Sequence, residues 1–258
     1  MIIAQISDTH ILEPGSNDPA GPVRAEAVRR VIRDINTLSD GLHGRPDLVI
    51  HTGDLAQHRT RQEYLFLRDL LGGLNMPYFV IPGNRDDRNL LAEIFPGVEQ
   101  VEGEEAFVHY SVEDYPIRLI AVDSQGFRSF KGNYSKARLS ALRRTLDQNT
   151  SQPTALFMHH PPFDITNVMD PFQYESREAV DALEALLSDY SHIVQIFSGH
   201  SHRARREILG RIPASTMPST ATDLRKDTYP DHLQDVPVYQ VHEWDGEGRF
   251  VSSTRIAL

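Results

Sequence analysis

The sequence contains no cysteine. Disulfide bonds, thiolate metal sites and cysteine nucleophiles are therefore excluded, because each of them needs a cysteine sulfur. A metal site in this chain would have to use histidine, aspartate, asparagine or glutamate side chains. Histidine is available for this purpose, since the chain has 12 of them, including the pairs His159-His160 and His200/His202.

The chain also lacks the long apolar runs that mark membrane segments. No stretch of about 18 consecutive apolar residues occurs in it. No basic segment or cleavage site precedes the first expected strand. We therefore expect a cytoplasmic protein that does not enter a membrane.

Basic residues are in the minority. Lys and Arg number 26 against 36 Asp and Glu, which gives a formal net charge of −10 at pH 7. Nucleic acid polymers and anionic membranes repel such a chain on average. The expected partner is therefore a small molecule, with no nucleic acid polymer and no membrane.

The overall composition is typical of a globular protein. Hydrophobic residues make up 40% and charged residues 24% of the 258 residues. This length fits one large domain or two small ones. Because we find no internal repeat and no low-complexity segment, we expect a single domain over residues 1–258. Its C-terminal portion, from about 203, is β-rich and should form part of a second sheet packed on the first.

Hydrophobic periodicity predicts alternating strands and helices over most of the chain. The expected strands lie at 2–7, 48–50, 76–82, 155–158 and 193–197, with a hairpin at 105–112 and 117–123. The expected helices lie at 23–40, 60–74, 138–146 and 176–190. This alternation indicates an α/β fold with substantial parallel pairing.

Polar side chains follow five of these strands at their carboxyl ends. They are Asp8, His10, Asp54, Asn84, His159, His200 and His202. Taken singly, each has a structural explanation, since Asp and Asn are common turn residues and buried histidines are often hydrogen-bonded. Gathered at one edge of a sheet, however, these donors would form a costly polar cluster unless a cation held them. The sequence therefore predicts a pair of bound metal ions.

The same residues lie in motifs that resemble those of a known family. Asp8-Thr-His10, Gly53-Asp54, Gly83-Asn84, His159 and Gly199-His-Ser-His202 follow, in order, the ligand motifs of the calcineurin-like metallophosphoesterases. The flanking Ile-Ser-Asp-Thr-His, Ile-Pro-Gly-Asn and Met-His-His-Pro-Pro segments are similar to those of bacterial class III cyclic-nucleotide and glycerophosphodiester phosphodiesterases. The resemblance spans residues 1 to about 202 and implies a four-layer αββα sandwich.

The resemblance also implies a role for each of these residues. By it, Asp8, His10 and His202 hold a first metal ion, Asn84, His159 and His200 hold a second, and Asp54 bridges the two. The adjacent His160 is the alternative to His159, because neighbouring residues of a strand point in opposite directions. Mixed carboxylate and imidazole donors suit Fe, Mn, Zn or Co better than Mg, and the sequence does not single out one of these metals.

A binuclear metal site of this kind hydrolyses phosphate esters. The two ions polarise the phosphoryl oxygens and lower the pKa of a bound water, so that hydroxide attacks phosphorus. We therefore interpret the chain as a metal-dependent phosphodiesterase that acts on a small phosphodiester, either a cyclic nucleotide or a glycerophosphodiester. The alternative is a phosphomonoesterase or a phosphonate-ester hydrolase. A noncatalytic scaffold would be free to lose ligands, and here every donor is present.

One position departs from the family pattern. After Asn84 the family usually has a histidine that contacts the phosphate or protonates the leaving group, and here that residue is Arg85. Arginine stays protonated near neutral pH, so it is a poor general acid, but its planar guanidinium can bind two phosphoryl oxygens. We hypothesise that Arg85 clamps the phosphate in the transition state, beside Asn84 and Asp54. The alternative is a surface arginine paired with Asp86 or Asp87.

Three further features have two interpretations each. Gln57 is either a substrate contact or an exposed residue before the next helix. The connections at 164–174 and 219–235 are either lids over the site or plain surface. Relatives in the family are often dimers or larger, and Leu119-Ile120 on the expected edge hairpin would suit an interface, although the pattern does not require an oligomer.

Overall fold

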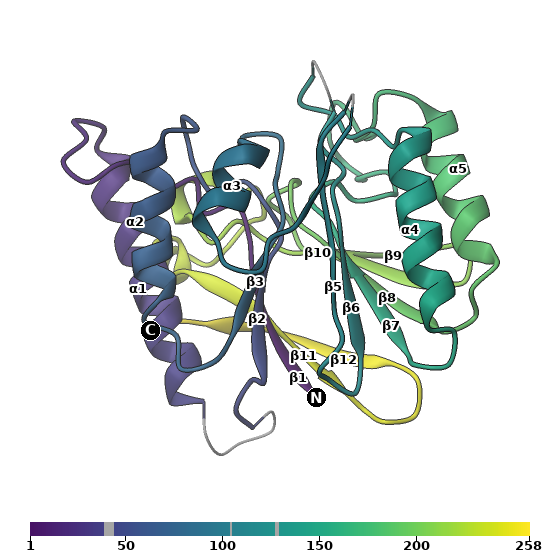
Figure 1. Cartoon of the computed structure of the whole chain (residues 1–258). Helices are drawn as coiled ribbons and strands as arrows, with labels where there is room; N and C mark the ends of the chain where they lie inside the picture. Colours follow the sequence, from purple (N-terminus) through teal and green to yellow (C-terminus); the bar gives the residue numbers. More distant parts are fainter. Residues whose placement is uncertain (39–43, 104, 127–128) are drawn as a thin grey trace.

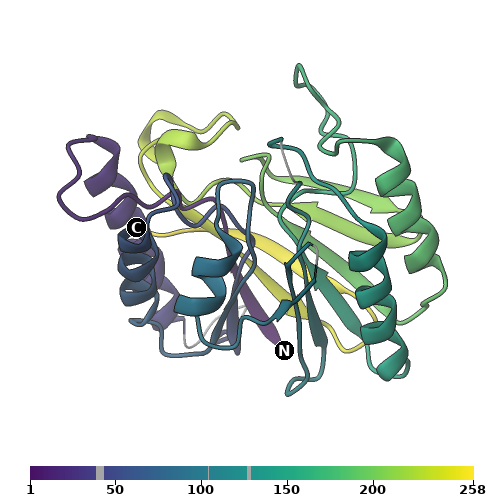
Figure 2. The same ribbon diagram turned by 45° about the horizontal axis from the view of Figure 1, so that its top comes forward.

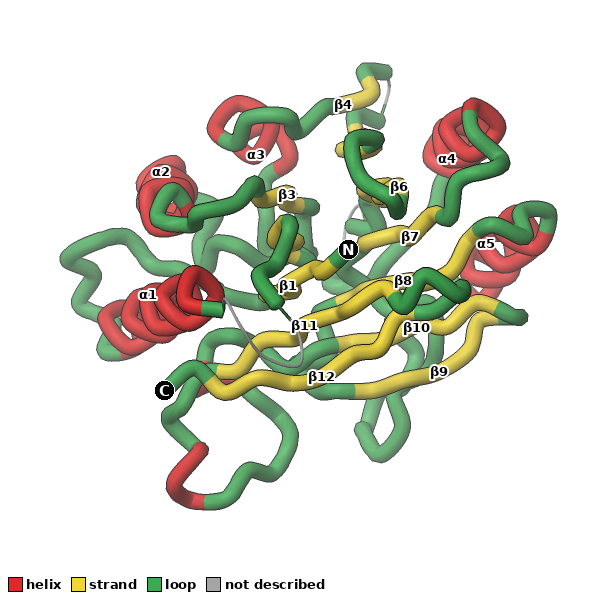
Figure 3. The backbone as a smooth tube through the Cα atoms, turned by 90° about the horizontal axis from the view of Figure 1, so that it is seen from below, coloured by secondary structure: helices red, strands yellow, loops and turns green. Residues whose placement is uncertain are grey.

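The chain folds into four layers, with two β-sheets lying between two sets of helices (Figure 1). The computed structural model describes residues 1–38, 44–103, 105–126 and 129–258. Within these residues the α-helices are α1 (Ala20–Thr37), α2 (Arg61–Leu71), α3 (Arg88–Ile94), α4 (Lys136–Gln148) and α5 (Arg177–Ser188). Helices α1, α2 and α3 cover one sheet, and α4 and α5 cover the other (Figure 3). The predicted four-layer αββα sandwich is therefore confirmed.

The first sheet contains the N-terminal and C-terminal strands of the chain. Its described strands are β1 (Ile2–Ile6), β2 (Leu48–His51), β3 (Tyr78–Val80), β11 (Val238–Trp244) and β12 (Phe250–Ile256), in the order β12-β11-β1-β2-β3. Strands β1, β2 and β3 are parallel, whereas β11 and β12 are antiparallel additions. The carboxyl ends of β1, β2 and β3 therefore meet at one edge.

The second sheet is built mainly from the middle of the chain. Its described strands are β4 (Gln100–Val101), β5 (Phe107–Val112), β6 (Arg118–Val122), β7 (Thr154–Phe157), β8 (Ile193–Ser198), β9 (Arg205–Leu209) and β10 (Ile212–Thr216). They are arranged in the order β4-β5-β6-β7-β8-β10-β9, with β6, β7, β8 and β10 parallel. The β-rich portion from about 203 contributes strands to both sheets.

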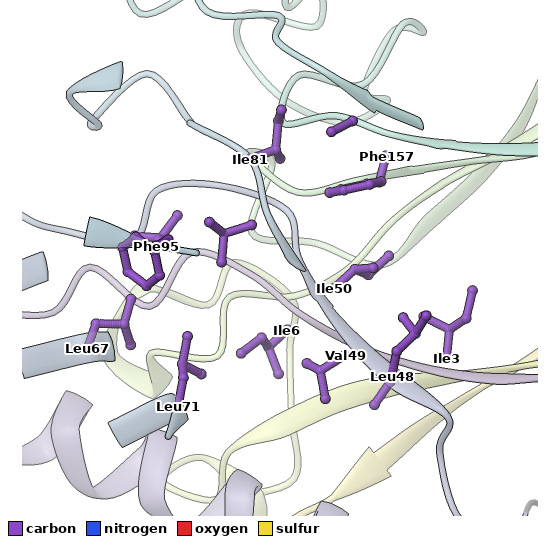
Figure 4. Close-up of a cluster of buried hydrophobic side chains, with 14 of the residues drawn as sticks. Ile3, Ile6, Leu48, Val49, Ile50, Leu67, Leu71, Ile81, Phe95 and Phe157 are labelled. Carbon is purple, nitrogen blue, oxygen red and sulfur yellow. The ribbon is translucent and has the colours of Figure 1, made fainter. Parts of the chain in front are cut away.

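The core lies between the two sheets and beneath the helices on the first of them. Leu48, Val49 and Ile50 are fully buried, and apolar side chains of both sheets meet around them (Figure 4). Burial of one such side chain contributes roughly 1.5–3 kcal/mol, so a core of this kind supplies the main driving force for folding. None of the helices in the described ranges is both long and apolar enough to cross a membrane.

The structure corrects the expected element boundaries at several places. Helix α1 begins at Ala20 and ends at Thr37, whereas the expected helix covered 23–40, of which residues 39 and 40 lie outside the described residues. The short helix α3 was not predicted. The sequence does contain one signal for this helix, an aspartate at position 87, which is a favoured N-cap residue. In the structure the Asp87 side chain caps the helix, accepting hydrogen bonds from Asn89 N at 2.9 Å and Leu90 N at 3.0 Å.

The expectation that Leu119-Ile120 lies on an edge hairpin is wrong. Strands β5 and β6 do form the predicted antiparallel hairpin, but β6 also pairs in parallel with β7 and so lies inside the sheet. Leu119 and Ile120 are both fully buried. These two residues are therefore core residues, and they offer no surface to a second subunit.

A buried histidine connects the two sheets. On β11, His242 Nε2 donates to Gln5 Oε1 at 2.9 Å, and its ring packs 4.3 Å from the ring of Phe197 on β8. His242 Nδ1 accepts a hydrogen bond from Ser252 Oγ at 2.7 Å. Burial, with a smaller contribution from Arg206, lowers the pKa of His242 to about 3. The ring is therefore neutral throughout the range in which a free histidine would gain a proton.

We expect this histidine to make the protein less stable in acid. Above about pH 6.5 neither the folded nor the unfolded chain protonates His242, so its contribution does not change with pH. Between that pH and about 3 only the unfolded chain binds the proton, and the free energy of unfolding falls as the pH falls. From pH 7 to pH 5 the expected loss is about 2 kcal/mol. This loss is measured by urea unfolding of the wild type and of His242→Gln at pH 7 and at pH 5.

The control for this prediction is His232→Gln, since His232 is exposed. The control should lose as much stability between pH 7 and pH 5 as the wild type does. His242→Gln should lose clearly less, although it is less stable at pH 7. Equal losses in His242→Gln and wild type would contradict the prediction.

Candidate metal centre

The predicted donors lie in loops that leave the carboxyl ends of parallel strands in both sheets. Asp8 and His10 follow β1, Asp54 follows β2, Asn84 follows β3, His159 follows β7, and His200 and His202 follow β8. The pairing of β1 with β2 continues into these loops, because Asp8 N donates to Gly53 O at 2.9 Å and His10 N donates to Asp54 O at 3.0 Å. The structure therefore brings all of these residues together where the two sheets meet.

One group of donors consists of Asp8, His10 and His202. Their potential ligand atoms all lie within 4.8 Å of one another. His202 Nδ1 donates to Leu224 O at 2.8 Å, which leaves Nε2 facing Asp8 Oδ1 at 3.2 Å. Both ring nitrogens of His10 are buried and have no hydrogen-bond partner within the described ranges. A buried imidazole left without a partner is costly, and a bound cation would supply one.

The second group gathers around His159. Its Nδ1 donates to Thr52 O at 2.8 Å, so that Nε2 carries the free lone pair. That nitrogen lies 3.1 Å from Asn84 Oδ1 and 3.2 Å from His200 Nδ1. His159 Nε2 and Asn84 Oδ1 are both acceptors, and a cation between them and His200 Nδ1 would hold the three atoms together.

Asp54 lies between the two groups. Its Oδ2 is 3.4 Å from His10 Nε2, and its Oδ1 is 3.6 Å from His159 Nε2. Oδ1 also accepts a hydrogen bond from Arg85 N at 2.7 Å, which fixes the plane of the carboxylate. One carboxylate oxygen is therefore directed at each group.

His160 is held differently from His159. Its Nδ1 accepts from Ser124 Oγ at 2.9 Å, and its Nε2 donates to Phe130 O at 3.0 Å. Although the ring lies close to His159 and His200, both of its nitrogens already have protein partners. This arrangement favours His159 as the ligand.

Five of the seven predicted donors have backbone conformations that are unusual for non-glycine residues. The φ angles of Asp8, His10, Asp54, His200 and His202 are 52°, 43°, 54°, 66° and 55°. Such left-handed conformations cost roughly 1–3 kcal/mol each and collect at functional sites. Backbone hydrogen bonds such as Asp8 N to Gly53 O and His10 N to Asp54 O hold these turns.

The protonation states suit a metal site. Burial lowers the pKa of His10 to about 4 and lowers the pKa of His200 well below its ordinary value, so both rings are neutral at pH 7. Burial opposes ionisation of Asp8, but the neighbouring His202, together with His159 and His10, outweighs it and holds the pKa of Asp8 well below its usual range. The pKa of His202 is raised, because Asp8 outweighs the effect of burial on it, so this ring would have to give up a proton to bind a metal ion. Neutral imidazoles and ionised carboxylates are the forms that bind metal ions. The His and Asp groups are thus arranged to hold metal ions.

Sequence reasoning missed several residues that support the donors. Asp86 is buried and accepts hydrogen bonds from Leu55 N at 3.1 Å and Gly83 N at 2.8 Å, so it joins the loops that carry Asp54 and Asn84. Burial, followed by the charge of Asp54, raises the pKa of Asp86 to about 7. The sequence shows an aspartate two residues after Asn84, but it does not show that this side chain would bind Leu55 N and Gly83 N.

The start of the segment 219–235 supports the site, whereas most of its later residues are exposed or half-buried. Ser219 Oγ donates to Asp8 O at 2.7 Å, and Thr220 Oγ1 accepts from Ser7 N at 3.3 Å. Both side chains are fully buried. The start of this connection therefore supports the Asp8 turn and is fixed in place, whereas a lid would have to move.

Arg85 and Gln57 occupy defined positions beside the donors. The Arg85 guanidinium lies 5.2 Å from the ring centre of Phe130, while Asp86 and Asp87 are occupied with backbone N–H groups. The alternative in which Arg85 pairs with either aspartate is therefore not supported. The Oε1 of Gln57 accepts a hydrogen bond from Arg24 at 3.0 Å, whereas no hydrogen bond of its amide nitrogen is found within the described residues.

A cavity of about 540 Å³ opens beside Asn84. Arg59, Arg88, Gln125 and the half-exposed ring of Phe130 line it. A smaller cavity, of about 230 Å³, reaches His200 and includes Arg203 and Lys226. Each of the two hollows is therefore lined by one of the donors, Asn84 in the larger and His200 in the smaller.

Comparison with known proteins points in the same direction. The model of the calcineurin-like phosphoesterase family matches residues 1–204. A probable glycerophosphodiester phosphodiesterase from Arcobacter nitrofigilis is 32% identical, with 98% of this chain and 92% of that protein covered. A probable cyclic nucleotide phosphodiesterase from Synechococcus is 28% identical, with coverage of 98% and 94%. A dimetal phosphatase from Danio rerio superposes with a TM-score of 0.70 at 13% identity, over 100% of this chain and 96% of that one.

Proposed function

This chain belongs to the calcineurin-like phosphoesterase family, and on that premise we propose that it hydrolyses small phosphodiesters at a centre that holds two metal ions. The observation that carries the proposal is the position of Asp54, whose two carboxylate oxygens lie 3.4 Å from His10 Nε2 and 3.6 Å from His159 Nε2. A single carboxylate directed at two groups of donors suits a bridge between two cations. The names of the similar proteins suggest a glycerophosphodiester or a cyclic nucleotide as substrate.

Each group of donors would hold one ion. Asp8, His10 and His202 would bind the first, Asn84, His159 and His200 the second, and Asp54 would be shared. When bound, such ions polarise phosphoryl oxygens and lower the pKa of water. The chemistry of the donors suits Fe, Mn, Zn or Co.

The chain itself would orient the substrate. Asn84 and Arg85 lie beside the 540 Å³ cavity or at its rim, where a phosphodiester could place one of its ester arms. The Arg85 guanidinium would bind phosphoryl oxygens and offset the negative charge that grows on them, but it cannot readily give up a proton. The Gln57 amide nitrogen is the remaining predicted contact.

The proposal is tested by paired initial rates on metal-stripped protein reconstituted with Mn²⁺. An aryl phosphodiester and the matching aryl monoester are compared, with Asn84→Ala as the control. We expect a faster, metal-dependent rate on the diester that is lost in the control. A higher rate on the monoester would favour the phosphomonoesterase alternative, and no metal-dependent turnover of either ester would contradict the proposal.

The proposed role of Arg85 leads to a separate prediction. Arg85→Ala should lower kcat for the phosphodiester by about 10²-fold, because it removes a charged donor from the site of developing charge. Arg33→Ala is the control, since Arg33 is an exposed arginine of α1. Initial rates and the metal content of each protein are measured together. An unchanged kcat in Arg85→Ala, with full metal content, would contradict the clamp.

Two expectations stay predictions of the sequence alone. They are the cytoplasmic location and assembly into dimers or larger oligomers. An oligomer would have to use a surface other than Leu119-Ile120, since both residues are buried.

A further inference from the structure

We propose that Arg24, a buried arginine of α1, is a positioning residue for one of the two metal sites, and that it acts through Asp223. The inference rests on the proposed function, because it assumes that two ions bind. It concerns the group formed by Asp8, His10 and His202, and it predicts that the group around His159 does not depend on Arg24.

Arg24 makes an unusually complete set of contacts for a charged residue in the interior. It is 7% exposed, and its guanidinium binds Asp223 with two parallel hydrogen bonds, Nε to Oδ1 at 3.2 Å and Nη2 to Oδ2 at 2.7 Å. Nη1 donates to His10 O at 3.1 Å and to Gln57 Oε1 at 3.0 Å. A buried guanidinium with a bidentate carboxylate partner is strongly held in one orientation.

Through these contacts Arg24 reaches two of the three donors of the first group. It binds the backbone carbonyl of His10 directly. Its partner Asp223 belongs to the 3₁₀ turn Thr222–Leu224, and the last carbonyl of that turn accepts the hydrogen bond from His202 Nδ1 at 2.8 Å. Arg24 therefore fixes the backbone of one imidazole donor and the turn that orients the ring of the other.

The placement of the turn explains why such a connection is needed. Asp223 lies 199 residues after Arg24 in the sequence, and the segment that carries it passes over the end of α1 (Figure 2). The side chain of Asp223 is 35% exposed, so little apolar packing holds it. The ion pair therefore adds a side-chain tie at the turn itself, between the hydrogen bonds of Ser219 and Thr220 before it and that of Lys226 N with His202 O after it.

Two donors of the second group, His159 and Asn84, have other supports, whereas the third, His200, donates its backbone N–H to Asp8 Oδ2 at 3.1 Å. His159 is oriented by Thr52 O, and the Asn84 backbone carbonyl accepts a hydrogen bond from Arg59 at 2.6 Å. The Asn84 loop is further held by Asp86. None of these contacts involves Arg24 or Asp223. Removal of the ion pair should therefore disturb the first group and spare the second.

The interpretation also accounts for Gln57. Its Oε1 is the third acceptor of the Arg24 guanidinium, beside His10 O and Asp223. Gln57 lies three residues after Asp54, so Arg24 joins the Asp54 loop to the His10 loop. Lysine could not replace this arginine, because a single ammonium group lacks the planar fork that serves several acceptors at fixed angles.

The test is isothermal titration calorimetry, in which Mn²⁺ is added to metal-free protein. Four proteins are compared: wild type, Arg24→Gln, Arg24→Lys and Asp223→Asn. Wild type should bind two ions. Each variant should weaken one of the two binding events by about 10- to 100-fold, as is usual for residues that orient metal ligands, and leave the other unchanged. Arg33→Gln, on the exposed face of the same helix, is the control and should bind as wild type does.

The site that weakens is identified with a second set of variants. His10→Ala removes a donor of the first group, so its remaining binding event belongs to the second group. Adding Arg24→Gln to His10→Ala should not change this event. If it weakens further, Arg24 supports both sites and the proposal is wrong.

The outcomes separate the possible failures. Wild type that binds one ion or none contradicts the proposed function rather than the role of Arg24. Equal weakening of both events in Asp223→Asn, or no weakening of either, overturns the proposal. The melting temperature of each metal-free variant is measured as well, because a general loss of stability would lower it without selecting one event. If Arg24→Gln fails to fold, the test uses Asp223→Asn instead. Asp223 is partly exposed, so its replacement should disturb the fold less.

Discussion

Asp54→Asn should lower the rate of phosphodiester hydrolysis by at least about 10³-fold, well beyond the 10- to 100-fold cost of residues that only orient ligands. The asparagine keeps the shape of the side chain but removes the negative charge and replaces one oxygen by an amide nitrogen. Because one oxygen of Asp54 is directed at each group of donors, this exchange would weaken the hold on both ions. Initial rates with excess Mn²⁺, and metal content by elemental analysis, measure the effect.

The matched control is Asp47→Asn. Asp47 comes just before the amino end of β2 and accepts a hydrogen bond from Ile2 N at 2.7 Å, whereas Asp54 lies beyond the carboxyl end of the same strand. The control should retain activity and metal. If Asp54→Asn keeps more than about a tenth of the wild-type rate with both ions bound, the bridging role assigned here would have to be abandoned.

Gly53→Ala should destabilise the fold by about 3 kcal/mol and disturb the metal centre as well. Gly53 has φ of 95°, a conformation that costs alanine roughly 1–2 kcal/mol. An added Cβ would also lie 2.5 Å from His159 Nδ1 and 2.8 Å from Gly83 N. The imidazole would have to move, and with it the hydrogen bond to Thr52 O that orients it. Urea unfolding and Mn²⁺ titration measure the two consequences.

Gly97→Ala separates backbone strain from crowding. Gly97 has φ of 81°, but no atom lies within 4 Å of the position that its Cβ would take. Its replacement should therefore cost only the left-handed conformation, roughly 1–2 kcal/mol, and leave metal binding intact. If Gly53→Ala proves no more costly than Gly97→Ala, the close approach of the Gly53 loop to His159 does not constrain the site.

Gly53 and Gly83 illustrate how much of the site could be predicted from the sequence. The glycine before Asp54 and the one before Asn84 belong to the motifs that carry the family resemblance, and the structure adds that their loops touch. A Cβ on Gly83 would lie 2.3 Å from Asp54 Oδ1. Local turn chemistry follows from residue type, because a glycine tolerates backbone angles that other residues avoid. Which loop lies against which depends on strand order, and no local pattern encodes it.

The same limit explains the errors at Leu119-Ile120 and at α3. Apolar alternation at 105–123 predicted a hairpin correctly, but it could not show that β7 would pair with the free side of β6. Helix α3 spans only seven residues, which is too short for its periodicity to be distinguished from a loop. Partners that are remote in sequence decide both features.

By itself the sequence determined the α/β class, the order of most strands and helices, and a set of candidate donor residues, since each depends on periodicity or on short motifs within one segment. Only the tertiary structure decided how Asp86 joins two loops and how Arg24 meets Asp223 across 199 residues. The physical reason is that a hydrogen bond or ion pair between distant segments forms only after the sheets have brought these segments together. The residues next to either partner in the sequence do not indicate which distant residue it will contact.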